Sequence, residues 1–281
     1  MRIFNSSASV WMVGLISGLV TLPISAELPT INEKIWLGYF VGFKNYRFQF
    51  GVTAKGTAIL QVMGKKAQPL SKKLTIPVEF VVEKVMPDGK MTRLKILPMS
   101  LESTQTATAK PKDVVFQGRV KGDVGFEVMV SEEQGDILLG GRLLKPEKAT
   151  SELRFSIRVK FPKAYADSGQ SGDKKQVDVF KEKTQGDRLQ LVWTDQKRLR
   201  VSTSEKIDAS SKEINGPGIA VLQLAFGSYE YKKFELTATE NSAMTLSNKP
   251  LVPLREGILV TWTADPSLDP AGKARLRLGI R

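Results

Sequence analysis

The feature that most constrains the fold of this chain is the alternation of apolar and polar residues along short segments. Residues 153–161 show it most clearly, because five apolar side chains alternate with Arg154, Ser156, Arg158 and Lys160. Successive side chains of a β-strand point to opposite faces, so this segment is predicted to be a strand with one apolar and one basic face. The same alternation recurs in residues 46–52, 74–82, 124–130 and 276–280. Helical periodicity is nearly absent, which predicts an all-β protein.

Turn-forming residues separate the alternating segments by a few positions. Examples are Lys121-Gly122-Asp123 and the Pro-Asp-Gly-Lys sequence at 87–90. Short connections of this kind join adjacent antiparallel strands. About a dozen strands at this spacing predict an antiparallel β-sandwich rather than βαβ units. Gly140-Gly141 interrupts an apolar run and predicts a β-bulge or a sharp bend in its strand.

The first 26 residues have the pattern of a secretory signal peptide. Residues 10–20 carry no charge, and the helix breaker Pro23 and the small residue Ala26 follow them. An apolar core of about a dozen residues is typical of a signal peptide and short of the roughly 20 that span a bilayer. We therefore expect residues 1–26 to be removed and the protein to be secreted or periplasmic. The alternative is an uncleaved N-terminal anchor. No second apolar stretch of spanning length follows.

The remaining chain divides at a polar stretch. Residues 162–175 contain two glycines and lack apolar periodicity, so they are predicted to be a linker or a long surface loop. The expected organisation is an N-terminal β domain over 27–161 and a C-terminal β domain over 176–281, in tandem.

The chain has no His and no Cys, which excludes many chemistries. Ser-His-Asp and Cys-His nucleophile systems need an imidazole, and zinc and iron–sulfur sites need His or Cys ligands. Calcium coordination by carboxylates and carbonyls remains open, as does acid–base chemistry by carboxylates on a sugar. We expect no cofactor, no metal and no catalytic residues, and we favour a binding protein over an enzyme.

Aromatic residues are concentrated in residues 36–50, with Lys44 and Arg47 among them. Phe48 and Phe50 alternate with polar residues and are predicted to be core. Trp36, Tyr39 and Tyr46 are the predicted exceptions, since an aromatic ring near a cation can stack on a sugar.

The net charge of +13 at pH 7 favours an acidic partner. Arg154, Arg158 and Lys160 form the first basic set that could contact one. Two similar sets are Lys197, Arg198 and Arg200, and Lys273, Arg275 and Arg277 with Arg281. The alternative for all three sets is a solvated face that protects edge strands from pairing with other chains.

Asp265 and Asp269 lie four residues apart in a segment with two prolines. They could bind calcium or act as an acid–base pair, but the Asp-Pro pairs are typical of turns, and we interpret the segment as a loop.

The prediction is therefore an exported, non-catalytic β-sandwich protein that binds an acidic polysaccharide or an anionic envelope surface; nucleic acid is not expected. A His-independent carbohydrate-active enzyme, a glycosidase or a polysaccharide lyase, is the first alternative. An outer-membrane β-barrel is the second, and charged residues at mid-strand weigh against it.

Overall fold

The computed structural model describes residues 39–53, 56–65, 68–70, 72–87, 91–97, 100–103, 113–144, 152–162, 188–201, 207–226, 229–230, 232–248 and 257–281. The predicted signal peptide, Trp36 and residues 163–175 of the predicted linker lie outside these ranges.

Within these ranges the chain is almost entirely β-structure. Its elements are β1 (Tyr39–Lys44), β2 (Phe48–Thr53), β3 (Thr57–Val62), η2 (Lys72–Leu74), β4 (Ile76–Val85), β5 (Met91–Leu94), β6 (Glu102–Ser103), β7 (Asp113–Val120), β8 (Val124–Glu133), β9 (Asp136–Leu144), β10 (Leu153–Phe161), β11 (Arg188–Trp193), β12 (Arg198–Val201), α1 (Lys212–Asn215), β13 (Ile219–Ala225), β14 (Lys233–Ala238), β15 (Ser242–Ser247), β16 (Ile258–Ala264) and β17 (Leu276–Ile280). None of the described helices is long and apolar enough to cross a bilayer.

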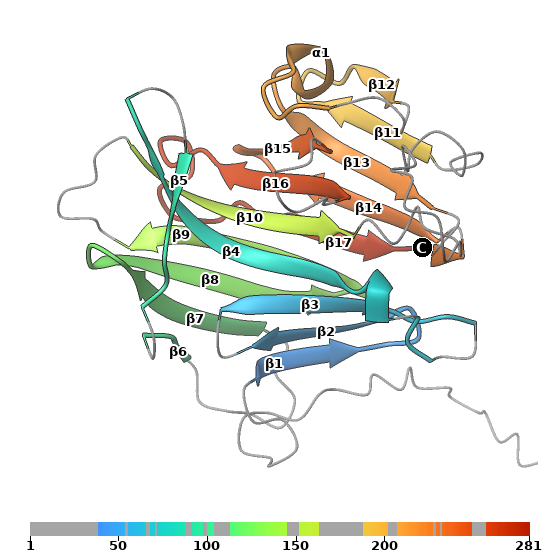
Figure 1. Ribbon diagram of the computed structural model, residues 1–281, viewed down its shortest axis with the longest axis horizontal. Helices are drawn as coiled ribbons and strands as arrows, with labels where there is room; N and C mark the ends of the chain where they lie inside the picture. Colours follow the sequence, from blue (N-terminus) through green and yellow to red (C-terminus); the bar gives the residue numbers. More distant parts are fainter. Residues whose placement is uncertain are drawn as a thin grey trace, which may run out of the picture.

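The strands form two antiparallel layers that face each other (Figure 1). The first layer has the order β1-β2-β3-β4-β10-β16-β15, with β5 pairing beside β4 beyond the end of β3. The second has the order β6-β7-β8-β9-β17-β14-β13-β11-β12. A bridge between Ile219 and Met244 joins the layers at one side, and a bridge between Ile96 and Val120 joins them at the other. The predicted antiparallel β-sandwich is confirmed. The strands form a curled sheet whose two layers enclose one core.

Aromatic side chains fill the space between the layers. The apolar face of β10 is buried as predicted, and Phe161 packs edge-on against Phe234 of β14 with ring centroids 5.2 Å apart. Phe80 of β4 and Phe116 of β7 make a similar contact at 5.6 Å. Each fully buried ring of this kind stabilises the fold by about 1.5–3 kcal/mol relative to an exposed one. The two layers therefore share one hydrophobic core.

Strand pairing joins the parts of the chain before and after residues 162–175. Ile157 of β10 lies opposite Trp262 of β16, and Leu138 of β9 lies opposite Arg277 of β17. The partners in each pair are more than 100 residues apart in the sequence. The core and both layers thus contain residues from both predicted domains.

Two local predictions have different outcomes. Lys121-Gly122-Asp123 forms the expected hairpin turn, with Val120 opposite Val124 and a positive φ of 96° that suits Gly122. The bulge predicted at Gly140-Gly141 is wrong, because β8 and β9 pair through both glycines without a change of register. The glycines are instead needed for close approach: a Cβ at Gly141 would collide with the Phe155 ring, and one at Gly140 would lie 2.7 Å from Cδ of Arg275.

Candidate functional site

The predicted basic set on β10 lies beside carboxylates of β4. Arg154 is exposed near the start of β10, whereas Arg158 and Lys160 are only partly exposed. The Arg158 guanidinium pairs with Glu83, and the Lys160 ammonium lies 3.4 Å from Glu79. The cations that the sequence pattern placed toward water are thus largely neutralised by the neighbouring strand.

This charged face of β4 and β10 has the contacts of a structural network. Glu83 is buried and also accepts a hydrogen bond of 3.1 Å from the buried Ser156 hydroxyl. Glu79 accepts a second cation, Arg93 of β5, at 3.0 Å. A buried carboxylate needs such partners, since desolvation would otherwise disfavour its charged form. The network holds β4, β5 and β10 together and leaves Arg154 as its exposed cation.

Among the predicted aromatic residues, Tyr46 does not lie at this face. Tyr46 precedes β2, whose first residue Phe48 pairs with Val62 at the end of β3. The register continues across β4 to the end of β10, so Tyr46 is at the opposite end of the strands from Arg154. Tyr39 lies on β1 opposite Thr53. The structure therefore does not bring Tyr46 and Arg154 together.

Tyr46 lies instead among arginines where β1 and β2 meet the end of β17. Tyr46 is 69% exposed, and the Arg47 guanidinium lies 5.0 Å from the centroid of its ring. Arg47 also donates a hydrogen bond of 3.0 Å to the carbonyl of Ile280, which ties the two layers together. At 69% exposure Tyr46 retains an open apolar face beside a cation.

Two more arginines meet at the buried carboxylate of Asp136, the first residue of β9. Nε of Arg277 lies 2.8 Å from Asp136 Oδ2, and Arg281 binds both carboxylate oxygens, with Nη2 2.7 Å from Oδ2. A Cβ at residue 279 would lie 2.8 Å from Asp136 Oδ1, so Gly279 makes room for this arrangement. We call Tyr46, Arg47, Lys233, Arg277 and Arg281 the basic corner. Arg277 and Arg281 contact Asp136, Arg47 joins Tyr46 to the Ile280 carbonyl, and Lys233 pairs with the backbone of Arg281.

Two arginines share the single buried carboxylate of Asp136 in the basic corner. Burial raises the pKa of Asp136, but hydrogen bonds from Arg281 and Arg277 outweigh it and hold the pKa below its usual value. The hydrogen bond from Arg281 to Asp136 raises the pKa of Arg281. Exposed Lys233 exchanges two backbone hydrogen bonds with Arg281. Arg277 and Arg281 thus share one carboxylate, and their side chains remain 37% and 43% exposed. Exposed Glu133 lies opposite Asp136 across the β8–β9 turn.

Of these residues, the sequence singled out Tyr46 as a ligand contact. Arg277 and Arg281 belonged to the third basic set, and their even spacing from Arg275, at i+2 and i+6, is that of a shared strand face. Arg275 has a structural role instead. Its side chain packs over Gly140, and its guanidinium donates hydrogen bonds to the carbonyls of Gly272 and Ala274 at 2.6 and 2.8 Å. No local pattern links Arg47 to Ile280, which lies 233 residues away.

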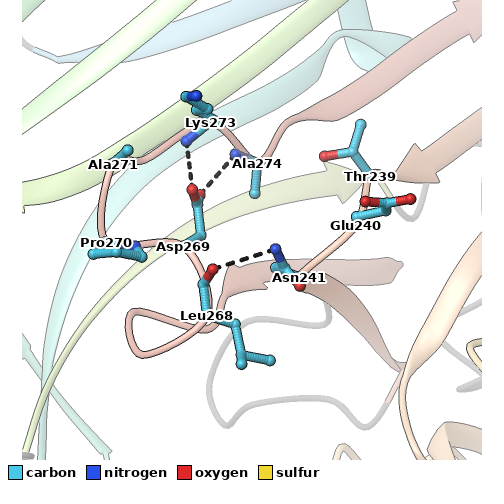
Figure 2. Close-up of a pocket in the computed structure, with 9 residues that line it drawn as sticks. All are labelled: Thr239, Glu240, Asn241, Leu268, Asp269, Pro270, Ala271, Lys273 and Ala274. Atoms are coloured by element: carbon cyan, nitrogen blue, oxygen red, sulfur yellow. Dashed lines mark hydrogen bonds between the residues drawn. The ribbon is translucent and has the colours of Figure 1, made fainter.

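Asp265 and Asp269 organise the loop that precedes β17, as the turn interpretation predicts. Asp265 accepts hydrogen bonds from the backbone and hydroxyl of Ser267 at 2.9 and 2.6 Å. Asp269 accepts backbone hydrogen bonds from Lys273 and Ala274, both at 2.7 Å. Their carboxylates therefore shape the loop, which forms one wall of a surface hollow (Figure 2).

Comparison with known proteins found remote structural similarity and no similarity in sequence. No protein-family model matches the chain, and no curated protein matches its sequence. The fold is similar to part of the α-N-acetylgalactosaminidase NagBb from Bifidobacterium bifidum in complex with GalNAc, with a TM-score of 0.49 and 11% identity over 85% of this chain and 36% of that one. The same enzyme in complex with Gal-NHAc-DNJ gives a TM-score of 0.49 and 13% identity over the same shares of the two chains. The chain thus spans about a third of the length of that enzyme.

A second similar structure is the Slr1438 protein from Synechocystis sp. PCC 6803. Its TM-score is 0.38 at 11% identity, over 80% of this chain and 92% of that one. Function has to be argued from the residues of the chain itself.

Proposed function

We propose that this protein is a non-catalytic binding module for an acidic polysaccharide and that the basic corner is its binding site. The observation that carries the proposal is the exposed Tyr46 beside Arg47, which binds the carbonyl of Ile280, the residue before Arg281, while the buried Asp136 orients the guanidinium groups of Arg277 and Arg281. An aromatic ring offers an apolar face to the C–H side of a sugar. Arginine guanidinium groups bind carboxylates and sulfates through paired hydrogen bonds.

Preorganisation supports this choice over the charged face of β4 and β10. At the basic corner, Asp136 holds two arginines in place, so a ligand would not have to order them. On the other face, Glu83 pairs one to one with Arg158, whereas Asp136 alone serves two arginines at the basic corner. An anion there would have to displace a buried carboxylate from its partner, which is unfavourable.

The test is the affinity for a heparin octasaccharide, measured by calorimetry with the full chain and four variants. We expect Tyr46→Ala, Lys233→Gln and Arg281→Gln each to weaken binding about fivefold to tenfold, because each removes a ring face or a charge-assisted hydrogen bond. Lys233→Gln leaves the Asp136 network intact and so separates loss of charge from loss of structure.

Arg154→Gln is the matched comparison variant, because Arg154 is an exposed cation at the other end of the strands. The proposal predicts a change of less than about twofold, as for a distant screened charge. A loss of affinity confined to Arg154→Gln would place the ligand on the charged face of β4 and β10 and would overturn the assignment to the basic corner.

We also propose that the protein is exported, on the strength of the apolar core and Pro23 in residues 1–26. The intact mass of the protein recovered from the cell envelope or medium should then correspond to a chain that begins at Glu27. A recovered chain that retains residues 1–26 would contradict cleavage.

A further inference from the structure

The hollow beside the β14–β15 turn is the second feature of the described surface with the chemistry of a site. It lies between residues 239–241 and residues 268–274, and its volume is about 520 Å³ (Figure 2). Small-molecule sites in proteins have volumes of about 300–1,000 Å³. The hollow is lined by none of the residues of the basic corner.

The two walls are fixed to each other by hydrogen bonds. The backbone of Asp265 donates to the carbonyl of Asn241 at 2.8 Å, and the Asn241 side chain donates to the carbonyl of Leu268 at 3.3 Å. At the far end, the backbone and hydroxyl of Thr239 contact the backbone of Arg275 at 3.0 and 2.7 Å. The hollow therefore exists before a ligand arrives, and binding does not have to order the loops.

The 268–274 loop is rigid in its own right. Asp269 is 9% exposed and uses both carboxylate oxygens to accept the backbone N–H groups of Lys273 and Ala274. Figure 2 shows this carboxylate between the two ends of the loop. Because Asp269 is fully occupied, the polar groups left to meet a ligand are those of Glu240, Asn241 and Lys273.

These groups and the apolar surface beside them define the ligand class. Neither the Glu240 carboxylate nor the Lys273 ammonium forms an ion pair with another described residue, and Leu268 exposes 62% of its surface at the rim. The carboxylate of Glu240 and the ammonium of Lys273 leave the lining without net charge from these two groups, and they offer a ligand an acceptor and a donor. A neutral sugar has hydroxyls that both donate and accept, and a C–H face that can rest on Leu268 and Pro270.

We propose that this hollow is a second binding site and that it takes one neutral hexose unit. Glu240 accepts hydrogen bonds from the sugar hydroxyls, Lys273 donates to others, and Leu268 packs against the ring. The site is independent of the basic corner, because it uses different residues and a ligand without charge.

The test is saturation-transfer difference NMR on the full chain with methyl β-glucoside, methyl β-galactoside and methyl N-acetyl-β-glucosaminide. We expect at least one of the three to bind in the millimolar range, with an affinity that does not change with salt. Glu240→Ala and Leu268→Ala should each weaken that binding at least about fivefold. Glu213→Ala, an exposed glutamate on α1 outside the hollow, is the matched control and should leave it unchanged.

The proposal is overturned if none of the three glycosides gives a transfer signal, or if Glu240→Ala and Leu268→Ala bind as the control does. Circular dichroism of each variant confirms that its fold is intact, and the exposure of Glu240 and Leu268 makes unfolding an unexpected outcome. Loss of the neutral-sugar signal would leave the salt-dependent binding of heparin unaffected, so the two proposals fail separately.

Discussion

Asp136 is the residue on which the geometry of the basic corner depends. Its carboxylate is 1% exposed and accepts hydrogen bonds from Arg277 and Arg281, which approach from β17 and the residue after it. Without this anion, two neighbouring guanidinium groups would repel each other at the end of one strand. The same carboxylate therefore stabilises the fold and orients the proposed binding groups.

Asp136→Asn should lower the free energy of unfolding by about 3 kcal/mol at pH 7, the lower end of the range for breaking a buried ion pair, because both arginines are partly exposed. The folded-state pKa of Asp136 lies below its usual value. Its stabilisation is therefore complete above the unfolded pKa of about 3.9 and is lost as the pH falls through the folded pKa. Urea unfolding of both proteins from pH 7 to pH 2 measures this.

The difference between wild type and Asp136→Asn should accordingly shrink below pH 4. Asp123→Asn is the control, since Asp123 pairs with Arg119 on the surface and its loss should cost less than about 1 kcal/mol. A difference that stayed constant down to pH 2 would show that Asp136 acts through its shape and not its charge.

At the scale of elements, the charged face of β4 and β10 holds neighbouring strands together through ion pairs and a hydrogen bond. Glu83 contacts Arg158 and Ser156 of β10, and Glu79 contacts Lys160 of β10 and Arg93 of β5. The contacts link three neighbouring strands on the side away from the aromatic core. This is the expected role for ion pairs with limited access to water.

Glu83→Gln and Arg158→Met should each destabilise the fold by about 3 kcal/mol, because each leaves one partly or fully buried charge without its partner. The double variant should cost less than the sum of the two, which a double-mutant cycle measures from urea midpoints. The exposed pair of Lys84 and Glu152 is the reference, with an expected coupling below about 1 kcal/mol. Strict additivity of the Glu83 and Arg158 variants would refute the ion pair.

The sequence predicted where the strands lie better than it predicted which strands pair with one another. Alternation is a local property, so β10 was predicted with its observed bounds, and the buried faces of β8 and β17 were predicted from the same pattern. The placement of β10 between β4 and β16 depends on contacts across 70 to 110 residues, which alternation does not encode. The alternation therefore placed the cations on one face of β10 without showing that glutamates of β4 pair with them.

The basic corner shows the same limit. The spacing of Arg277 and Arg281 predicted a common face, and Tyr46 was predicted as an exception to the core because an aromatic ring near a cation can stack on a sugar. Their meeting with Asp136 and Arg47 arises where β1, β2, β9 and β17 end together, and it is a property of the topology. Gly140-Gly141 was misread for a related reason, since the Phe155 ring that requires Gly141 comes from another strand.

At the scale of the whole molecule, strand pairing across the predicted linker has a consequence for folding. β16 and β17 come from the C-terminal half, yet they pair with β10 and β9 of the N-terminal half. Separate fragments 27–161 and 176–281 should each lack a cooperative thermal transition, because each exposes a pairing edge and part of the core. Mixed or co-expressed fragments should recover one. Calorimetry of the fragments tests this, and independent melting of both would contradict it.

The central claim is that an acidic polysaccharide binds through the cations of the basic corner. The salt dependence of the binding affinity tests this claim most directly. The dissociation constant of a heparin octasaccharide should be measured for the wild type, Lys233→Gln and Arg154→Gln at several salt concentrations. Screening of exposed charges predicts wild-type affinity that falls steeply between about 0.05 and 0.5 M NaCl, a shallower slope for Lys233→Gln and an unchanged slope for Arg154→Gln. No binding at low salt, or binding that does not vary with salt, would contradict the account.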